Sequence, residues 1–144
     1  MNTMHNDGDL IMNNEPTAEL QQRIESIEAG YEFMLAYAAQ GHATDRDLGP
    51  GQNIRKYLQE INSALNGMSE TVRAVAESKN PDGYQSYSGF LEALDGDVVK
   101  SQGAIKLVLA QASISSQLID NLNASIHLRA LLTDLFVLDE ALKS

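Results

Sequence analysis

The feature that most constrains this chain is an apolar spacing that alternates between four and three residues over long segments. Between positions 20 and 75 it includes Leu20, Ile24, Ile27, Tyr31, Met34, Ala38 and then Ile54, Leu58, Ile61, Leu65, Met68, Val72 and Val75. An average step of 3.5 residues places these side chains along one seam of an α-helix that packs at a shallow angle against others. No segment shows the alternation of apolar and polar residues that is typical of a strand. The sequence therefore predicts an all-α fold.

Four such seams predict an antiparallel, up-down-up-down four-helix bundle. A flexible acidic tail is expected at residues 1–15, followed by one helical domain at residues 16–144. The four helices of that domain are predicted over residues 16–41, 52–78, 97–120 and 123–143.

Some helix boundaries depend on turn residues that compete with the apolar spacing. Asn66-Gly67 is a common turn dipeptide, but the seam continues through it, so one helix is predicted across this point. Asp95-Gly96-Asp97 is expected to cap the third helix. A break near residues 120–123 is expected to separate the last two helices, with one continuous helix from 97 to 143 as the alternative.

The charge of the chain excludes some partner classes. Its 144 residues contain 20 acidic and 10 basic side chains, a formal net charge of −10. Binding to nucleic acid or to an anionic membrane requires an excess of Lys and Arg, so neither is expected. The absence of cysteine excludes disulfides and thiolate-bound metals. No secretory signal and no apolar stretch long enough to span a membrane is recognised, which predicts a cytoplasmic protein.

The negative charge is concentrated toward the first helix, where Glu25, Glu28 and Glu32 recur at helical spacing. The simplest interpretation is a solvated helix face, and the functional one is a docking surface for a protein partner with a basic surface. Phe33 and Tyr37 lie off the seam. They are expected either to pack under a loop or to serve as the apolar anchor of such a partner.

The last helix is apolar over more of its circumference than one seam requires. Its residues Leu128, Leu132, Leu135 and Phe136 predict self-association as a homodimer through this helix, alone or together with the third, unless this helix lies at the centre of the bundle.

No motif for catalysis or metal binding is complete. A di-iron bundle needs Glu-x-x-His on two helices, and the sequence has none. His127, the one histidine placed to project into the bundle, is expected to be a partly buried packing residue. No cofactor is predicted. The predicted function is a non-catalytic protein–protein interaction module, such as an adaptor, assembly factor, small chaperone or regulator. The alternative is a carboxylate-rich bundle that binds a metal or small cofactor, with a ferritin-like oxidoreductase or storage role.

Overall fold

The computed structural model describes residues 2–143 and the side chains of residues 15–143. This part of the chain is helical and contains no strand, which confirms the all-α prediction. The helices are α1 (Asn2–Ala39), α2 (Ile54–Leu65), α3 (Met68–Lys79), α4 (Ser88–Leu109), α5 (Ser116–Asn123) and α6 (Ile126–Lys143), with short 3₁₀ helices η1 (Pro50–Gln52) and η2 (Tyr84–Tyr87). The flexible tail predicted for residues 1–15 stays a prediction, because the side chains of residues 1–14 lie outside this description.

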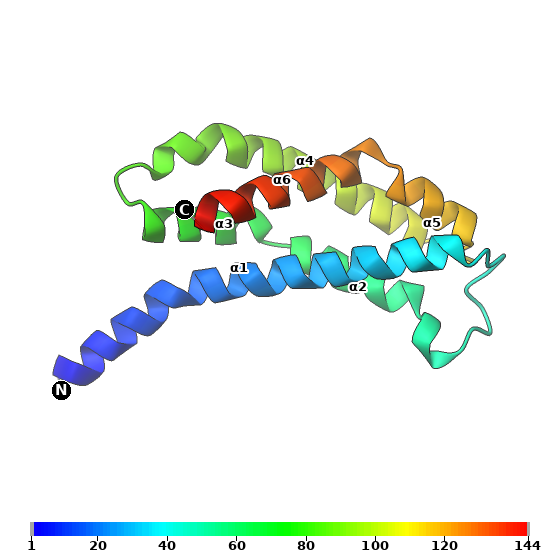
Figure 1. Ribbon diagram of the computed structural model, residues 1–144, viewed down its shortest axis with the longest axis horizontal. Coiled ribbons are helices and arrows are strands. Elements are labelled where there is room, and N and C mark those ends of the chain that lie inside the picture. Colours follow the sequence, from blue (N-terminus) through cyan, green and yellow to red (C-terminus); the bar gives the residue numbers. More distant parts are fainter. Residues whose placement is uncertain (1, 144) are drawn as a thin grey trace.

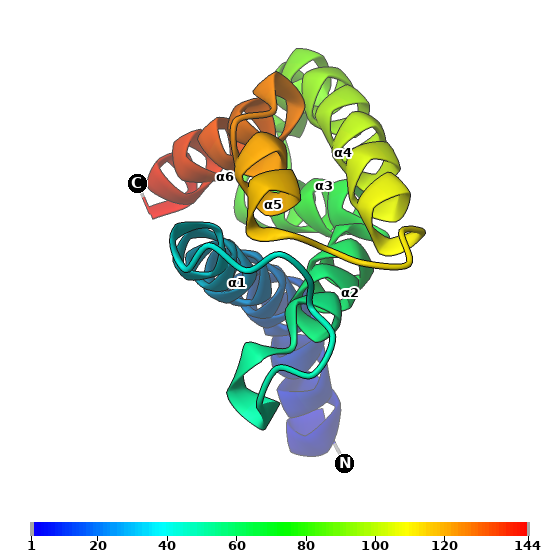
Figure 2. The same ribbon diagram turned by 90° about the vertical axis from the view of Figure 1, so that its right-hand side faces the viewer.

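The chain runs back and forth along one long axis. In Figure 1, α1 runs along the lower side, α2 and α3 return behind α1 and α6, α4 runs along the upper edge, and α5 and α6 return. α1 packs against α2, α3 and α5, whereas α4 packs mainly against α6 (Figure 2). Buried apolar side chains from all six α-helices form one hydrophobic cluster between the helices.

The second predicted helix is in fact two helices, α2 and α3. Gly67 has a left-handed backbone with a φ of 78°, and the chain turns there. Arg23 of α1 stabilises the turn, because its guanidinium donates to the backbone carbonyls of Ala64 and Asn66 at the end of α2. Leu65 and Met68 are both buried, so the apolar seam continues across the turn. The prediction of one continuous helix was wrong because an unbroken seam does not require an unbroken backbone.

The third predicted helix also has different limits. α4 begins at Ser88, so Asp95-Gly96-Asp97 lies inside a helix and does not cap one. The chain then leaves the helix at residues 110–115, and the Ser115 hydroxyl caps α5 by accepting from the Leu118 N–H at 3.0 Å. A break does precede the last helix, but it lies at residues 124–125 and not at the predicted residues 120–123, which belong to α5: α5 ends at Asn123 and α6 begins at Ile126. Within residues 2–143, six α-helices therefore replace the four helices predicted.

Candidate functional site

The outer face of α1 carries the three glutamates singled out from the sequence. Glu25, Glu28 and Glu32 are all exposed, and none of the ion pairs among the described residues involves them. Glu25 accepts one hydrogen bond, at 3.2 Å, from the Gln21 amide on the same helix. Spacings of three and four residues place the three carboxylates on consecutive turns of one face. This set of three residues is called the acidic face below.

The burial of α1 explains why this face points outward. Its opposite side carries Leu20, Ile24, Ile27 and Met34, which are buried against the neighbouring helices. Arg23 is the sole basic residue between positions 15 and 39, and it turns toward α2. The negative charge of the acidic face is therefore not compensated by a base on the same part of α1.

One apolar residue lies on the same side of α1 as the acidic face. Leu35 is 48% exposed, and it follows Glu32 by three residues and Glu28 by seven. These spacings bring the leucine side chain next to the carboxylates on the helix surface. Sequence reasoning missed Leu35. Its position outside the 3.5-residue seam was the available signal, because a leucine off the seam of a packed helix is left exposed.

Phe33 is half-buried between α1 and α2. Its ring stacks on the ring of Tyr57 with a centroid separation of 4.1 Å and an interplanar angle of 13°. Phe33 therefore lies at the edge of the core, where it packs against a helix and not under a loop. Its exposed area is smaller than a partner anchor on a free helix face would present.

Tyr37 packs under a loop, which is the first of the two alternatives expected for it, and it does not lie on the surface as a partner anchor. Tyr37 is fully buried, and its hydroxyl donates to the backbone carbonyl of Ile114 at 2.6 Å. The physical reason is a long-range contact: the segment between α4 and α5 covers the end of α1, which no local periodicity reveals. Burial, and then the nearby Asp45 carboxylate, raise the pKa of Tyr37, so the phenol stays protonated and keeps donating.

Polar contacts fasten this segment to the end of α1. The buried Ser116 hydroxyl donates to the backbone carbonyl of Tyr37 at 2.6 Å and accepts from the His42 N–H at 2.7 Å. The backbone N–H of Ser116 donates to the carbonyl of His42 at 2.8 Å. The carbonyl at the end of α1 is thereby satisfied inside the protein.

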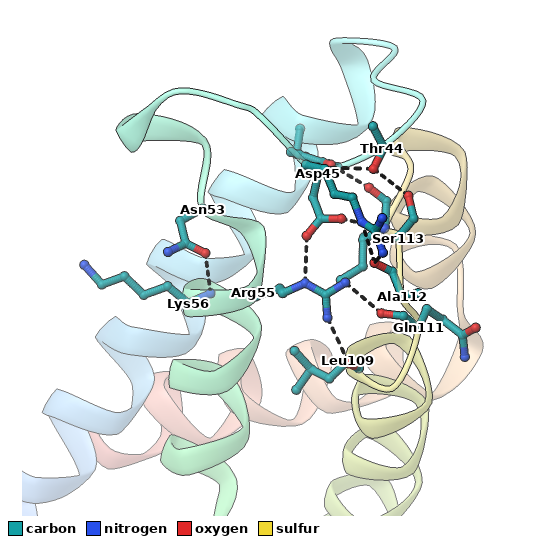
Figure 3. Close-up of polar contacts among 12 residues, drawn as sticks. Thr44, Asp45, Asn53, Arg55, Lys56, Leu109, Gln111, Ala112 and Ser113 are labelled. Carbon is teal, nitrogen blue, oxygen red and sulfur yellow. Dashed lines mark hydrogen bonds and ion pairs between the residues drawn. The ribbon is translucent and has the colours of Figure 1, made fainter.

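Arg55 and Asp45 connect the loop after α1 and the start of α2 with the segment between α4 and α5 (Figure 3). Arg55 Nε lies 2.7 Å from Asp45 Oδ2, and its two terminal nitrogens donate to the backbone carbonyls of Leu109 and Gln111 at 3.0 and 2.7 Å. Asp45 Oδ1 accepts from the Ile114 N–H at 2.8 Å. Burial alone would raise the pKa of Asp45, but the hydrogen bonds from Arg55 and Ile114 outweigh it and lower the pKa. This cluster positions two loops and leaves no free group for chemistry.

The face of α6 predicted to self-associate is largely buried within the chain. Leu128, Leu132 and Leu135 pack in the core, because α6 lies against α4 and α5 and needs a wide apolar side to cover them. Phe136 does remain on the surface, where it is 60% exposed beside Val137. The structure therefore leaves one of the four predicted contact residues available to a second copy.

A pair of carboxyl groups lies between α4 and α6. Asp134 Oδ2 is buried without a donor, and the Asp97 carboxyl faces it. Burial first, and then hydrogen bonding to and repulsion from Asp97, raise the pKa of Asp134 to about 7. Two carboxyl groups share a hydrogen bond when one of them holds a proton. Sequence reasoning missed this pair, since its members are 37 positions apart on different helices.

The described residues offer no ready metal site. His127 is exposed, contrary to the expectation that it is a partly buried packing residue. No three His, Asp or Glu side chains in this part of the chain come together as metal ligands. The alternative prediction of a bound metal or cofactor stays untested.

Comparison of the chain with protein-family models, with curated proteins and with solved structures finds no match. Within residues 2–143, none of the helices is both long and apolar enough to cross a membrane.

Proposed function

We propose that this chain is a non-catalytic protein–protein interaction module, such as an adaptor, assembly factor, small chaperone or regulator, that binds a basic protein partner on the outer face of α1. The observation that carries the proposal is the acidic face itself. Glu25, Glu28 and Glu32 are exposed on consecutive turns, and the nearest base in the sequence, Arg23, is turned toward α2. A basic partner would find three uncompensated carboxylates in one row.

The magnitudes assign different roles to charge and to apolar contact. Exposed ion pairs contribute about 0.2–1 kcal/mol each, so the acidic face mainly sets orientation and association rate. Affinity needs an apolar anchor that is buried on binding. Leu35 fits this role better than Phe33 and Tyr37, because it is exposed on the same side of α1, whereas Phe33 stacks inside and Tyr37 is buried.

The test is a comparison of charge-reversed variants in capture from an extract of the source cells. Reversal of Glu25, Glu28 and Glu32 to Lys should strongly reduce capture of the partner. The matched control reverses three exposed glutamates on other helices, Glu60, Glu77 and Glu140, and it should capture the partner as the wild type does. Equal loss in both variants would show that net charge alone matters and would contradict a docking site on α1.

The purified partner then separates the two contributions. Charge reversal should slow association and flatten its dependence on salt, since screening acts on exposed charges. Leu35→Ala should leave the association rate nearly unchanged and speed dissociation. If binding is indifferent to both changes, α1 is not the interface.

A further inference from the structure

A second surface of the molecule is exposed and apolar, on the outer side of α4. Val99 is 67% and Leu107 66% exposed, and they lie two turns apart on one side of this helix. α4 forms the outer edge of the molecule in both views (Figures 1 and 2). Large apolar side chains that are exposed together mark surfaces that bind another molecule.

Two charges on this side of α4 lie at equal distances on either side of Val99, and the exposed Asp95 and Lys100 flank them. Glu92 precedes Val99 by seven residues and Lys106 follows it by seven, so the three lie in one row along the helix. Both charged side chains are exposed, and none of the ion pairs among the described residues involves them. When two copies of α4 pack antiparallel with their Val99 residues facing each other, Glu92 of each copy faces Lys106 of the other. This row is complementary to itself.

Beside this row, the surface of α4 carries no side chain at two positions. Gly96 and Gly103 lie beside the row, and a Cβ added at either glycine would meet no atom within 4 Å. Packing within the chain therefore does not require glycine at these positions, although glycine disfavours a helix interior. A missing side chain on an exposed face lets the backbone of another helix approach closely, which would bring Val99 and Leu107 into contact with it.

From this geometry we infer that the outer face of α4 binds a second copy of this chain, as an isologous dimer in which two α4 helices pack antiparallel about Val99. The occupant is a second copy because the complementary charges are both on the same row of the same helix. A symmetric dimer requires such a self-complementary patch. This interface differs from the one predicted on α6, of which the chain itself buries three residues.

Sedimentation equilibrium of charge variants tests the arrangement. The wild type should show a monomer–dimer equilibrium. Glu92→Lys and Lys106→Glu each place two like-charge contacts in the antiparallel dimer, so each should raise the dimer Kd by about tenfold or more. In an equimolar mixture, one chain of each variant restores opposite charges at both contacts, so the two variants should form a heterodimer as tight as the wild-type dimer. Glu77→Lys, which changes the net charge equally on α3, should leave the Kd unchanged.

Each other outcome overturns the inference. A wild-type chain that sediments only as a monomer shows that no such dimer exists. Single variants that dimerise as the wild type does exclude the antiparallel pairing, since a parallel pair would place Glu92 against Glu92. If Phe136→Glu dissociates the dimer and Val99→Glu does not, the contact lies on α6. Circular dichroism of each variant checks that these surface changes leave the fold intact.

Discussion

At the scale of single residues, Asp134 makes the stability of the fold depend on pH. Its pKa is raised from 3.8 to about 7 in the folded chain by burial and by Asp97. Between these two values the folded state holds a proton that the unfolded state has released. Stability therefore falls as the pH rises from about 4 to about 7.

Asp134→Asn should remove this dependence, because an amide carries no charge and can donate to Asp97. The thermal midpoint of the variant should change little over that range and exceed the wild-type midpoint at pH 8. Glu140→Gln, an exposed position on the same helix, should keep the wild-type pH dependence. A variant that loses stability with pH as the wild type does would show that the carboxyl pair is not the titrating group.

Gly30 lies at a position where a side chain would clash with α2. A Cβ at this position would lie 2.5 Å from both Cγ1 and Cδ1 of Ile61, a buried side chain of α2. Gly30→Ala should therefore destabilise the fold by about 1–3 kcal/mol through overpacking, despite the better helix propensity of alanine. The free energy of unfolding in urea measures this loss. At the exposed neighbour, Ala29→Gly should cost about 1 kcal/mol from propensity alone. A Gly30→Ala variant more stable than the wild type would contradict this close approach of α1 and α2.

The sequence allowed the exposure of the three glutamates to be predicted, but not the contact that buries Tyr37. A residue's place on a helix face follows from spacing along that helix. Glu25, Glu28 and Glu32 lie beside the seam and face solvent for this reason. Tyr37 is buried by Ile114, which is 77 positions away and belongs to no helix. Contacts made by loops leave no periodic pattern, so they cannot be read from one sequence.

At the scale of elements, the apolar seams were predictable and the helix ends were not. Leu65 and Met68 stay on one seam although the chain turns between them at Gly67. The Asn66-Gly67 dipeptide carried the correct local information, and the regular spacing argued against it. The turn is possible because Arg23 binds the carbonyls that end α2, a contact between positions more than 40 residues apart. Local turn chemistry and tertiary contact together decided where the helix ends.

The junction between the α1–α2 loop and the α4–α5 loop depends on Arg55. Arg55→Met should lower the free energy of unfolding by about 1.5–3 kcal/mol, since charged hydrogen bonds to Asp45 and to two carbonyls are lost. Hydrogen exchange of the Ile114 amide should accelerate, because Asp45 loses the partner that orients it. Lys56→Met, the same charge change at the next and exposed residue, should alter stability by less than about 0.5 kcal/mol. Equal effects of the two substitutions would show that charge, and not this junction, is responsible.

At the scale of the whole molecule, the back-and-forth course of the chain places its two candidate surfaces apart. α1 lies along one edge of the fold and α4 along the opposite edge (Figure 1). A dimer formed through α4 would therefore leave the acidic face of each copy free. Such a dimer would present two docking surfaces for a basic partner, and binding to a multivalent target would gain from both.

The absence of cysteine from the whole chain allows a direct test of the α4 dimer. Val99→Cys places one thiol per chain at the proposed symmetry axis, where two thiols face each other. A disulfide needs Cα atoms about 4.4–6.8 Å apart, which a close antiparallel pair of helices provides at its axis. Mild oxidation should convert this variant to a covalent dimer, and Glu92→Lys in the same chain should slow the conversion.

The matched thiol is Val137→Cys, because Val137 on α6 is exposed to a similar extent, 56% against 67%. Random collisions cross-link two exposed thiols at similar rates, so the ratio of the two rates reports specific association. Non-reducing electrophoresis over a time course measures it. A faster reaction at position 99 is expected because dimerisation holds those thiols together. Equal rates would exclude a preferred contact at α4, and a faster reaction at position 137 would place the contact on the side of α6 that carries Phe136.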